Sequence, residues 1–157
     1  MCHSHKLIFV TGAPGSGKTY HIRNALELCE LPRIDIKEMY EKSPEACQFD
    51  GWKIAQDMLI DAAIEWSDQL QSDVVCEAIL LKGTPSRARL IEELKKRGVS
   101  NTFIDLHEDY ETCQQRVITD FANFMNSGPC EEDIEPARTY FNKRMDILRS
   151  YHEKGLV

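Results

Sequence analysis

The sequence predicts a three-layer α/β sandwich, in which helices cover both faces of a parallel sheet of four to five strands. Short apolar runs typical of buried strands alternate with longer segments of helical periodicity. A glycine-rich turn joins the first of these strands directly to a helix. Because parallel strands need crossover connections, this alternation favours repeated β-α-β units in a single domain spanning residues 1–157.

The first half of the chain contains two predicted strands and two predicted helices. Residues 6–10 ("KLIFV") form the first strand, and the helix after the glycine-rich turn ends at "LPR" (31–33), since a residue before proline leaves the helical conformation. That helix carries an apolar face made of Ile22, Ala25, Leu26 and Cys29. Residues 33–36 are a brief strand, and residues 52–70 form a long helix.

The middle of the chain predicts a strand, a helix and another strand. Residues 73–76 are a buried strand that continues into "EAILLKG". The next helix has Thr84 as its N-cap, Pro85 in its first turn and Gly98 as its stop. Residues 102–106 ("TFIDL") form the following strand.

Two helices complete the chain, and they are expected to form a lid at about residues 116–140. They span about residues 109–125 and 136–152, and "NSGPCEED" separates them. Pro136 is expected to open the second helix, behind the acidic residues. Its predicted core stripe is Ala137, Tyr140, Phe141, Leu148 and Tyr151.

Composition excludes several classes of protein. The chain has 157 residues and a formal net charge of -7, which disfavours a clamp for long nucleic acids because such clamps need clustered basic residues. No apolar run approaches the ~20 residues of a membrane span, so no membrane partner is expected. Six cysteines without paired spacing, and no secretory leader, indicate free thiols and a cytoplasmic location, as a monomer or small homo-oligomer.

The strongest signal is the segment "GAPGSGKT", which satisfies the G-x-x-x-x-G-K-[ST] pattern (Walker A) between a strand and a helix. In this P-loop, backbone N–H groups surround the phosphates of a nucleotide at a helix N-terminus. Lys18 supplies charge to the β- and γ-phosphates, and the Thr19 hydroxyl is placed to bind Mg²⁺. The predicted ATP-binding residues are Gly12, Ala13, Pro14, Gly15, Ser16, Gly17, Lys18 and Thr19.

Other motifs decide among the reactions that a P-loop serves. A GTPase needs N-K-x-D after a strand, but "NKRMD" (142–146) has one residue too many and lies inside a predicted helix. No strand ends in the Asp-Glu pair of a motor ATPase. The third strand ends in Glu77 alone, which is placed to hold a Mg²⁺-bound water or to be a structural acid. These observations leave a kinase as the better fit.

A kinase needs a carboxylate near the γ-phosphate and cations that cover the transferring group. Asp35 ends the short second strand and should open into the same crevice as the P-loop; Asp50 is the alternative base. In the lid, Arg116 lies before the Gly-Pro break, and Arg138 and Arg144 lie after it. Arg116 and Arg138 are the predicted catalytic arginines.

These segments together resemble small P-loop kinases of the polynucleotide-kinase and zeta-toxin type, among the AAA-type ATP-binding proteins. The likeness rests on "FVTGAPGSGKT", the acid in "RIDIKEMY", "DVVCEAILLKGTPSRARLIEELKKRG", and "IDLHEDYETCQQRV" leading to a lid. It implies Asp35 as general base, Arg116 as a lid arginine and Arg87 as an acceptor-side cation. It also implies the strand order 2-3-1-4-5.

The expected activity is therefore the transfer of the γ-phosphate of ATP, with Mg²⁺, to a hydroxyl acceptor. A nucleic-acid 5′ end, a nucleoside and a small metabolite are all open, with an acceptor pocket expected along residues 37–60 and 80–90. The alternative is an ATP-binding or ATP-hydrolysing module that regulates a partner and transfers no phosphate.

Overall fold

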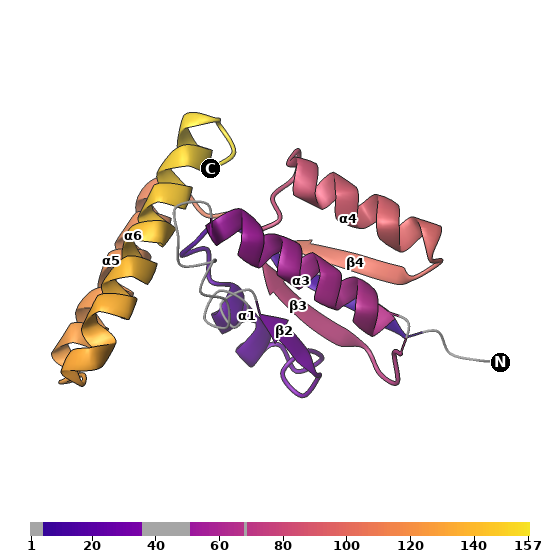
Figure 1. Cartoon of the computed structure of the whole chain (residues 1–157), viewed down its shortest axis with the longest axis horizontal. Coiled ribbons are helices and arrows are strands. Elements are labelled where there is room, and N and C mark those ends of the chain that lie inside the picture. The colour runs from indigo at the N-terminus through magenta and orange to yellow at the C-terminus, as the bar shows by residue number, and fades with distance from the viewer. Residues whose placement is uncertain (1–4, 36–50, 68) are drawn as a thin grey trace. The chain divides into compact units, whose positions relative to one another are not determined.

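The structure is a computed structural model that describes residues 5–35, 51–67 and 69–157 (Figure 1). Two compact units make up the chain. The sheet unit contains the chain up to Gly12 and Lys18–Leu106, and the helical unit contains Ala13–Gly17 and His107–Val157. The P-loop thus contributes its two ends to the sheet unit and its middle to the helical unit.

Four parallel strands form the core of the sheet unit, in the order β2-β3-β1-β4. β1 (Lys6–Thr11) lies between β3 (Val74–Ala78) and β4 (Ser100–Asp105), and β2 (Arg33–Asp35) lies outside β3. The predicted α/β class and the order of these four strands are confirmed. All four strands lie within two residues of their predicted bounds, because short apolar runs identify buried strands well.

One face of the sheet packs against α1 (Lys18–Asn24) and the turns that follow it. The buried cluster on this face consists of Ile8, Val10, Ile22, Leu28 and Val75. The first helix is shorter than predicted, since it ends at Asn24 and residues 25–31 form tight turns. As a result Leu28 is buried, whereas Leu26, predicted on the apolar face, is 90% exposed.

The other face of the sheet carries α3 (Gly51–Ser67) and α4 (Pro85–Lys96), which lie side by side over the strands (Figure 1). Side chains alternate along a strand, so the neighbours of Ile8 and Val10 point to this face. Phe9 stacks on Phe103 of β4, with ring centroids 4.9 Å apart. α4 begins at Pro85 after Thr84, as predicted, but the Thr84 hydroxyl donates to the carbonyl of Leu81 instead of capping the helix.

The helical unit contains the antiparallel pair α5 (Tyr110–Asn126) and α6 (Glu131–Glu153). Phe121 stacks on Phe141 at 4.7 Å between centroids, and Arg144 pairs with Asp120 at 3.3 Å. Of the predicted core stripe of α6, only Leu148 is fully buried.

The predicted start of α6 is wrong by five residues. α6 begins at Glu131, and Pro136 lies inside it. The acidic residues Glu131, Glu132 and Asp133 occupy its first turn, where negative side chains stabilise the positive end of the helix dipole. The break between the helices is accordingly limited to residues 127–130.

Candidate active site

Four polar side chains lie at or near the carboxyl ends of the parallel strands. Asp35 ends β2 and is the register partner of Glu77 on β3. Thr11 and Asp105 end β1 and β4 and are also register partners. Open α/β sheets bind ligands outside this edge, so these four residues mark the candidate site of the unit.

A chain of polar contacts joins α1, β3 and β2 at this edge. The Thr19 hydroxyl donates to Glu77 Oε1 at 2.5 Å. Arg33 Nη2 donates to Asp35 Oδ2 at 2.7 Å and lies 3.1 Å from Glu77 Oε2. The structure therefore brings together Thr19, Glu77 and Asp35, all three of which the sequence singles out.

The two carboxyl groups are held in a poorly hydrated place. Asp35 is 8% exposed and Glu77 is 4% exposed. Burial, followed by the neighbouring Asp35 carboxylate, raises the pKa of Glu77, and the Thr19 hydroxyl and Arg33 guanidinium lower it only in part. A buried pair of carboxylates of this kind attracts a cation strongly.

Lys18 lies at the first turn of α1, where the P-loop ends. Its ammonium group donates to the carbonyl of Gly12 at 3.0 Å, across the loop. Both residues belong to the sheet unit. The P-loop lysine therefore closes the base of the loop in this structure.

The middle of the P-loop packs on α5 within the helical unit. Ala13 joins Cys113 and Leu148 in a buried cluster. Gly15 has φ +81° and approaches the backbone of Cys113 so closely that a Cβ there would lie 2.3 Å from the Cys113 carbonyl oxygen. Only glycine fits this position, since a side chain would meet backbone that cannot move aside.

Arg116 of α5 lies against the same segment. Its Nη1 donates to the carbonyl of Gly15 at 3.2 Å, and its Nη2 lies 3.5 Å from Glu108 Oε1. A Cβ at Gly17 would lie 3.6 Å from Arg116 Nη1. The predicted lid arginine is thus beside the P-loop glycines.

The other two arginines of the predicted lid have different surroundings. Arg138 is 52% exposed and pairs with Glu135 of its own helix at 3.5 Å. Arg144 bridges α6 to Asp120 of α5 and lies over the ring of Tyr140. Neither pair includes a P-loop residue, and Arg144 has the environment of a structural residue of the helix pair. The alternative base Asp50 lies outside the described residues.

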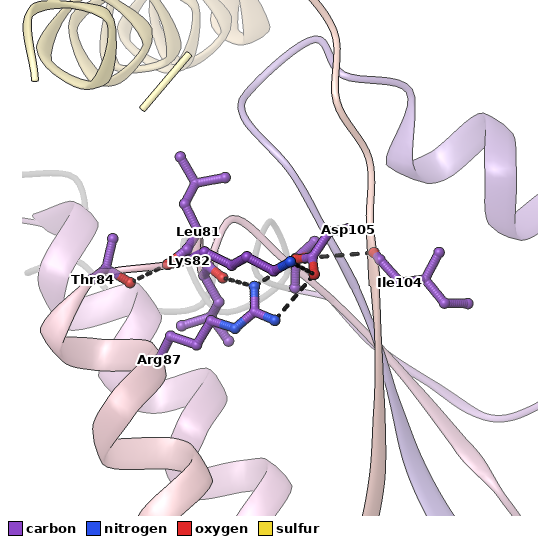
Figure 2. Close-up of polar contacts among 8 residues, drawn as sticks. Leu81, Lys82, Thr84, Arg87, Ile104 and Asp105 are labelled. Carbon is purple, nitrogen blue, oxygen red and sulfur yellow. Dashed lines mark hydrogen bonds and ion pairs between the residues drawn. The ribbon is translucent and has the colours of Figure 1, made fainter. Parts of the chain in front are cut away.

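Asp105 is a second centre of polar contacts that the sequence did not reveal (Figure 2). Both terminal nitrogens of Arg87 donate to its carboxylate, at 2.5 and 3.1 Å, and the Thr11 hydroxyl donates to it at 2.6 Å. Lys82 lies 3.7 Å away. The Arg87 guanidinium, which also lies over the Phe103 ring, holds the pKa of Asp105 at about 2.

These contacts bear on Arg87, which the resemblance implies as an acceptor-side cation. Its side chain is 9% exposed, and its fork is engaged by Asp105 and by the Leu80 carbonyl. In this arrangement Arg87 links α4 to Asp105 at the end of β4, and Asp105 in turn accepts from Thr11 at the end of β1. Arg33 was also missed, although its spacing of two from Asp35 places both side chains on one face of a strand.

The residues present suit ATP and Mg²⁺. The Ser16 hydroxyl is buried and has no hydrogen-bond partner among the residues that the structure describes. Buried polar groups are normally hydrogen-bonded, so such a hydroxyl is expected where a loop binds a ligand. Glu77 Oε2 likewise receives no hydrogen bond there, and its contact with Arg33 is an ion pair without hydrogen-bond geometry. Hydroxyl and carboxylate oxygens, completed by phosphates, are the ligands that Mg²⁺ prefers.

Comparisons with known proteins support the fold. No protein-family model matches the chain, and no curated protein matches it. Among solved structures, a putative kinase from Chloroflexus aurantiacus is 16% identical with a TM-score of 0.59, and 87% of this chain aligns with 76% of that one. A gluconokinase from Sinorhizobium meliloti is 17% identical with a TM-score of 0.54, over 93% of this chain and 76% of that one.

A third similar structure belongs to the Pnkp1/Rnl/Hen1 RNA repair complex. It is 18% identical with a TM-score of 0.56, and 98% of this chain aligns with 47% of that one. The chain therefore has a fold like that of small P-loop kinases. Within the described residues, none of the helices has the length and apolar character needed to cross a bilayer.

Proposed function

We propose that this protein is an ATP- and Mg²⁺-dependent phosphotransferase that moves the γ-phosphate to a hydroxyl acceptor. The observation that carries the proposal is the Thr19–Glu77–Arg33–Asp35 cluster at the carboxyl edge of the sheet, in a chain with a complete P-loop. A motor ATPase carries its two acids next to each other at the end of one strand, whereas Asp35 and Glu77 lie on the neighbouring strands β2 and β3. A kinase needs an acid apart from the metal-binding one, because the acceptor hydroxyl has to be oriented and deprotonated.

Each proposed role follows from the chemistry of the residue. The backbone of residues 12–19 holds the phosphates, and Lys18 adds a positive charge to them. Thr19 and Glu77 hold Mg²⁺, which when bound neutralises charge on the phosphates. Asp35 accepts the hydrogen of the acceptor hydroxyl and orients its oxygen.

The helical unit has a proposed part as well. Arg116 stabilises the charge that develops on the transferring group, and Arg138 is the second candidate cation of the lid at about residues 116–140. The bond from Arg116 to Gly15 supports the first assignment, because it keeps a guanidinium at the P-loop without consuming all five of its donors.

The acceptor is tested with a panel. ATP labelled at the γ-phosphate is offered with 5′-hydroxyl RNA, 5′-hydroxyl DNA, nucleosides, gluconate and related sugars. Label transferred to one acceptor class, and lost in Lys18→Ala, is the expected result. Release of inorganic phosphate at the same rate with and without every acceptor would instead support the regulatory ATP-hydrolysing module.

A further inference from the structure

Arg33 connects the two carboxylates to which the proposed function assigns different tasks. Its Nη2 lies 2.7 Å from Asp35 Oδ2 and 3.1 Å from Glu77 Oε2, so one nitrogen serves both groups. The other oxygen of Glu77 accepts from Thr19. Glu77 is therefore contacted at both oxygens, by the hydroxyl hydrogen bond at Oε1 and by the ion pair with the guanidinium at Oε2.

The two contacts of Arg33 are unequal. The contact with Asp35 is a short charge-assisted hydrogen bond, which is the stronger type. The contact with Glu77 is longer and lacks hydrogen-bond geometry. Arg33 can therefore leave Glu77 while it keeps Asp35, and its side chain, at 28% exposed, has more room to shift than that of Glu77 at 5%.

Charge gives the reason for such a shift. Among the residues that the structure describes, the cluster contains two carboxyl groups and one guanidinium, whose charges sum to -1 when both carboxyl groups are ionised. A divalent cation that binds Thr19 and Glu77 repels the guanidinium, and the repulsion is strong where little water screens it. Arg33 and the metal therefore compete for the same carboxylate.

We infer that Arg33 is an internal counter-ion of the proposed metal site, which holds Glu77 in the metal-free protein and releases it to Mg²⁺. The inference rests on the proposed function for the identity of the metal ligands. It assigns to Arg33 a positioning role: it keeps the buried carboxylates paired without metal, and it lowers the affinity for Mg²⁺.

The test measures metal binding without acceptor or turnover. Arg33→Gln removes the charge and keeps a polar side chain, and Arg33→Lys keeps the charge. Arg89→Gln is the matched control, because Arg89 also pairs with a carboxylate, that of Asp57 at 3.0 Å, but at an exposed place. Each variant is unfolded thermally in chelator and in millimolar Mg²⁺, and its affinity for a nonhydrolysable ATP analogue is measured by calorimetry in both conditions.

Arg33→Gln should lower the unfolding midpoint in chelator by about 4 °C or more, and Mg²⁺ should restore part of the loss. The gain in analogue affinity on adding Mg²⁺ should be about tenfold larger in Arg33→Gln than in wild type. Arg33→Lys and Arg89→Gln should give the wild-type gain.

A gain in Arg33→Gln no larger than in wild type, or no response to Mg²⁺ in that variant, overturns the inference. If Arg33→Gln is unfolded in chelator, refolding on addition of Mg²⁺ supports the inference and failure to refold overturns it. Because no acceptor is present, the result is separate from the proposed function. A chain with the expected Mg²⁺ response but no phosphate transfer would refute the kinase alone.

Discussion

Arg116 on α5 donates a hydrogen bond to the carbonyl of Gly15, 101 positions earlier in the chain. The bond joins α5 to the middle of the P-loop, and both partners belong to the helical unit. Glu108, 3.5 Å from the other terminal nitrogen, helps to fix the guanidinium in this orientation. An arginine held in this way beside the P-loop is positioned before any ligand binds, which is the arrangement that its proposed electrostatic role requires.

Replacing Arg116 by alanine should therefore reduce phosphate transfer more than it reduces ATP binding. We expect the transfer rate to fall by about 10²-fold or more, and ATP affinity to fall by about tenfold at most, because the backbone amides and Lys18 remain. Single-turnover transfer and calorimetry measure the two quantities. Arg149→Ala is the control, since Arg149 also lies in the helical unit and its pair with Asp146 is exposed. Equal losses in binding and in transfer would reassign Arg116 to the folding of the loop.

Gly15→Ala should damage the same region for a steric reason. The new Cβ would lie 2.3 Å from the Cys113 carbonyl oxygen, and the φ of +81° is unfavourable for alanine. We expect a loss of unfolding free energy clearly above the ~1 kcal/mol of backbone strain alone, together with loss of ATP binding. Gly128→Ala separates the two effects, because Gly128 has φ +69° and open space around it. Similar losses in denaturant unfolding of the two variants would refute the close approach.

The strands and the P-loop were predictable because their signals are local. Each strand is a short apolar run, and the P-loop motif fixes four of eight consecutive positions, between a strand and a helix. Helix ends were less certain. Pro136 suggested the start of α6, but α6 begins five residues earlier, with the acidic turn at Glu131. The apolar spacing of Leu26 and Cys29 suggested that the first helix continues there, but α1 ends at Asn24.

The missed residues share a different cause. Arg33 and Asp105 gain their importance from partners on other strands and helices, which a single sequence does not reveal. Arg33 reaches Glu77 only because β2 pairs with β3, and Asp105 reaches Thr11 only because β4 pairs with β1. The close approach of Gly15 to Cys113 is equally non-local. The sequence indicates which side chains lie at the ends of strands. Which of these side chains contact one another depends on the order of the strands in the sheet.

Asp105 should make the free energy of unfolding depend on pH in the acidic range. Its pKa in the folded protein is about 2, below the usual aspartate value of 3.8, so its contribution is complete above pH 3.8 and is lost as the pH falls towards 2. Asp105→Asn should destabilise the protein by about 2 kcal/mol at neutral pH, because Arg87 is left buried without its counter-charge (Figure 2). The variant should also lose part of the acid-dependent slope between pH 4 and 2.

Denaturant unfolding at several pH values measures both effects. Asp146→Asn is the matched control, since Asp146 faces Arg149 at 3.7 Å but is 68% exposed. Its loss should stay within about 0.5 kcal/mol. If Asp105→Asn loses no more unfolding free energy than the control variant at every pH, the Arg87–Asp105 pair does not stabilise the packing of β1, β4 and α4.

Asp35→Asn should separate nucleotide binding from chemistry. The substitution keeps the size and polarity of the side chain but removes the charge that is proposed to attract the acceptor proton. In the proposed function Lys18, Thr19 and the backbone amides of the P-loop hold ATP, so we expect ATP affinity to change by no more than a few fold. Transfer should fall by about 10² to 10⁴, and the lower end of this range fits a reaction that asks little of its base.

Arg33 complicates this variant in a measurable way. Without the Asp35 charge, the Arg33 guanidinium still faces the Glu77 carboxylate, and its hold on Glu77 should tighten. Asp35→Asn should therefore need more Mg²⁺ than wild type for half-maximal transfer. The double variant Asp35→Asn with Arg33→Gln should need less Mg²⁺ than Asp35→Asn alone. The half-maximal Mg²⁺ concentration, measured beside the maximal rate, distinguishes the two roles. A base acting alone predicts a lower rate at an unchanged Mg²⁺ requirement, and a residue that only supports the fold predicts loss of ATP binding as well.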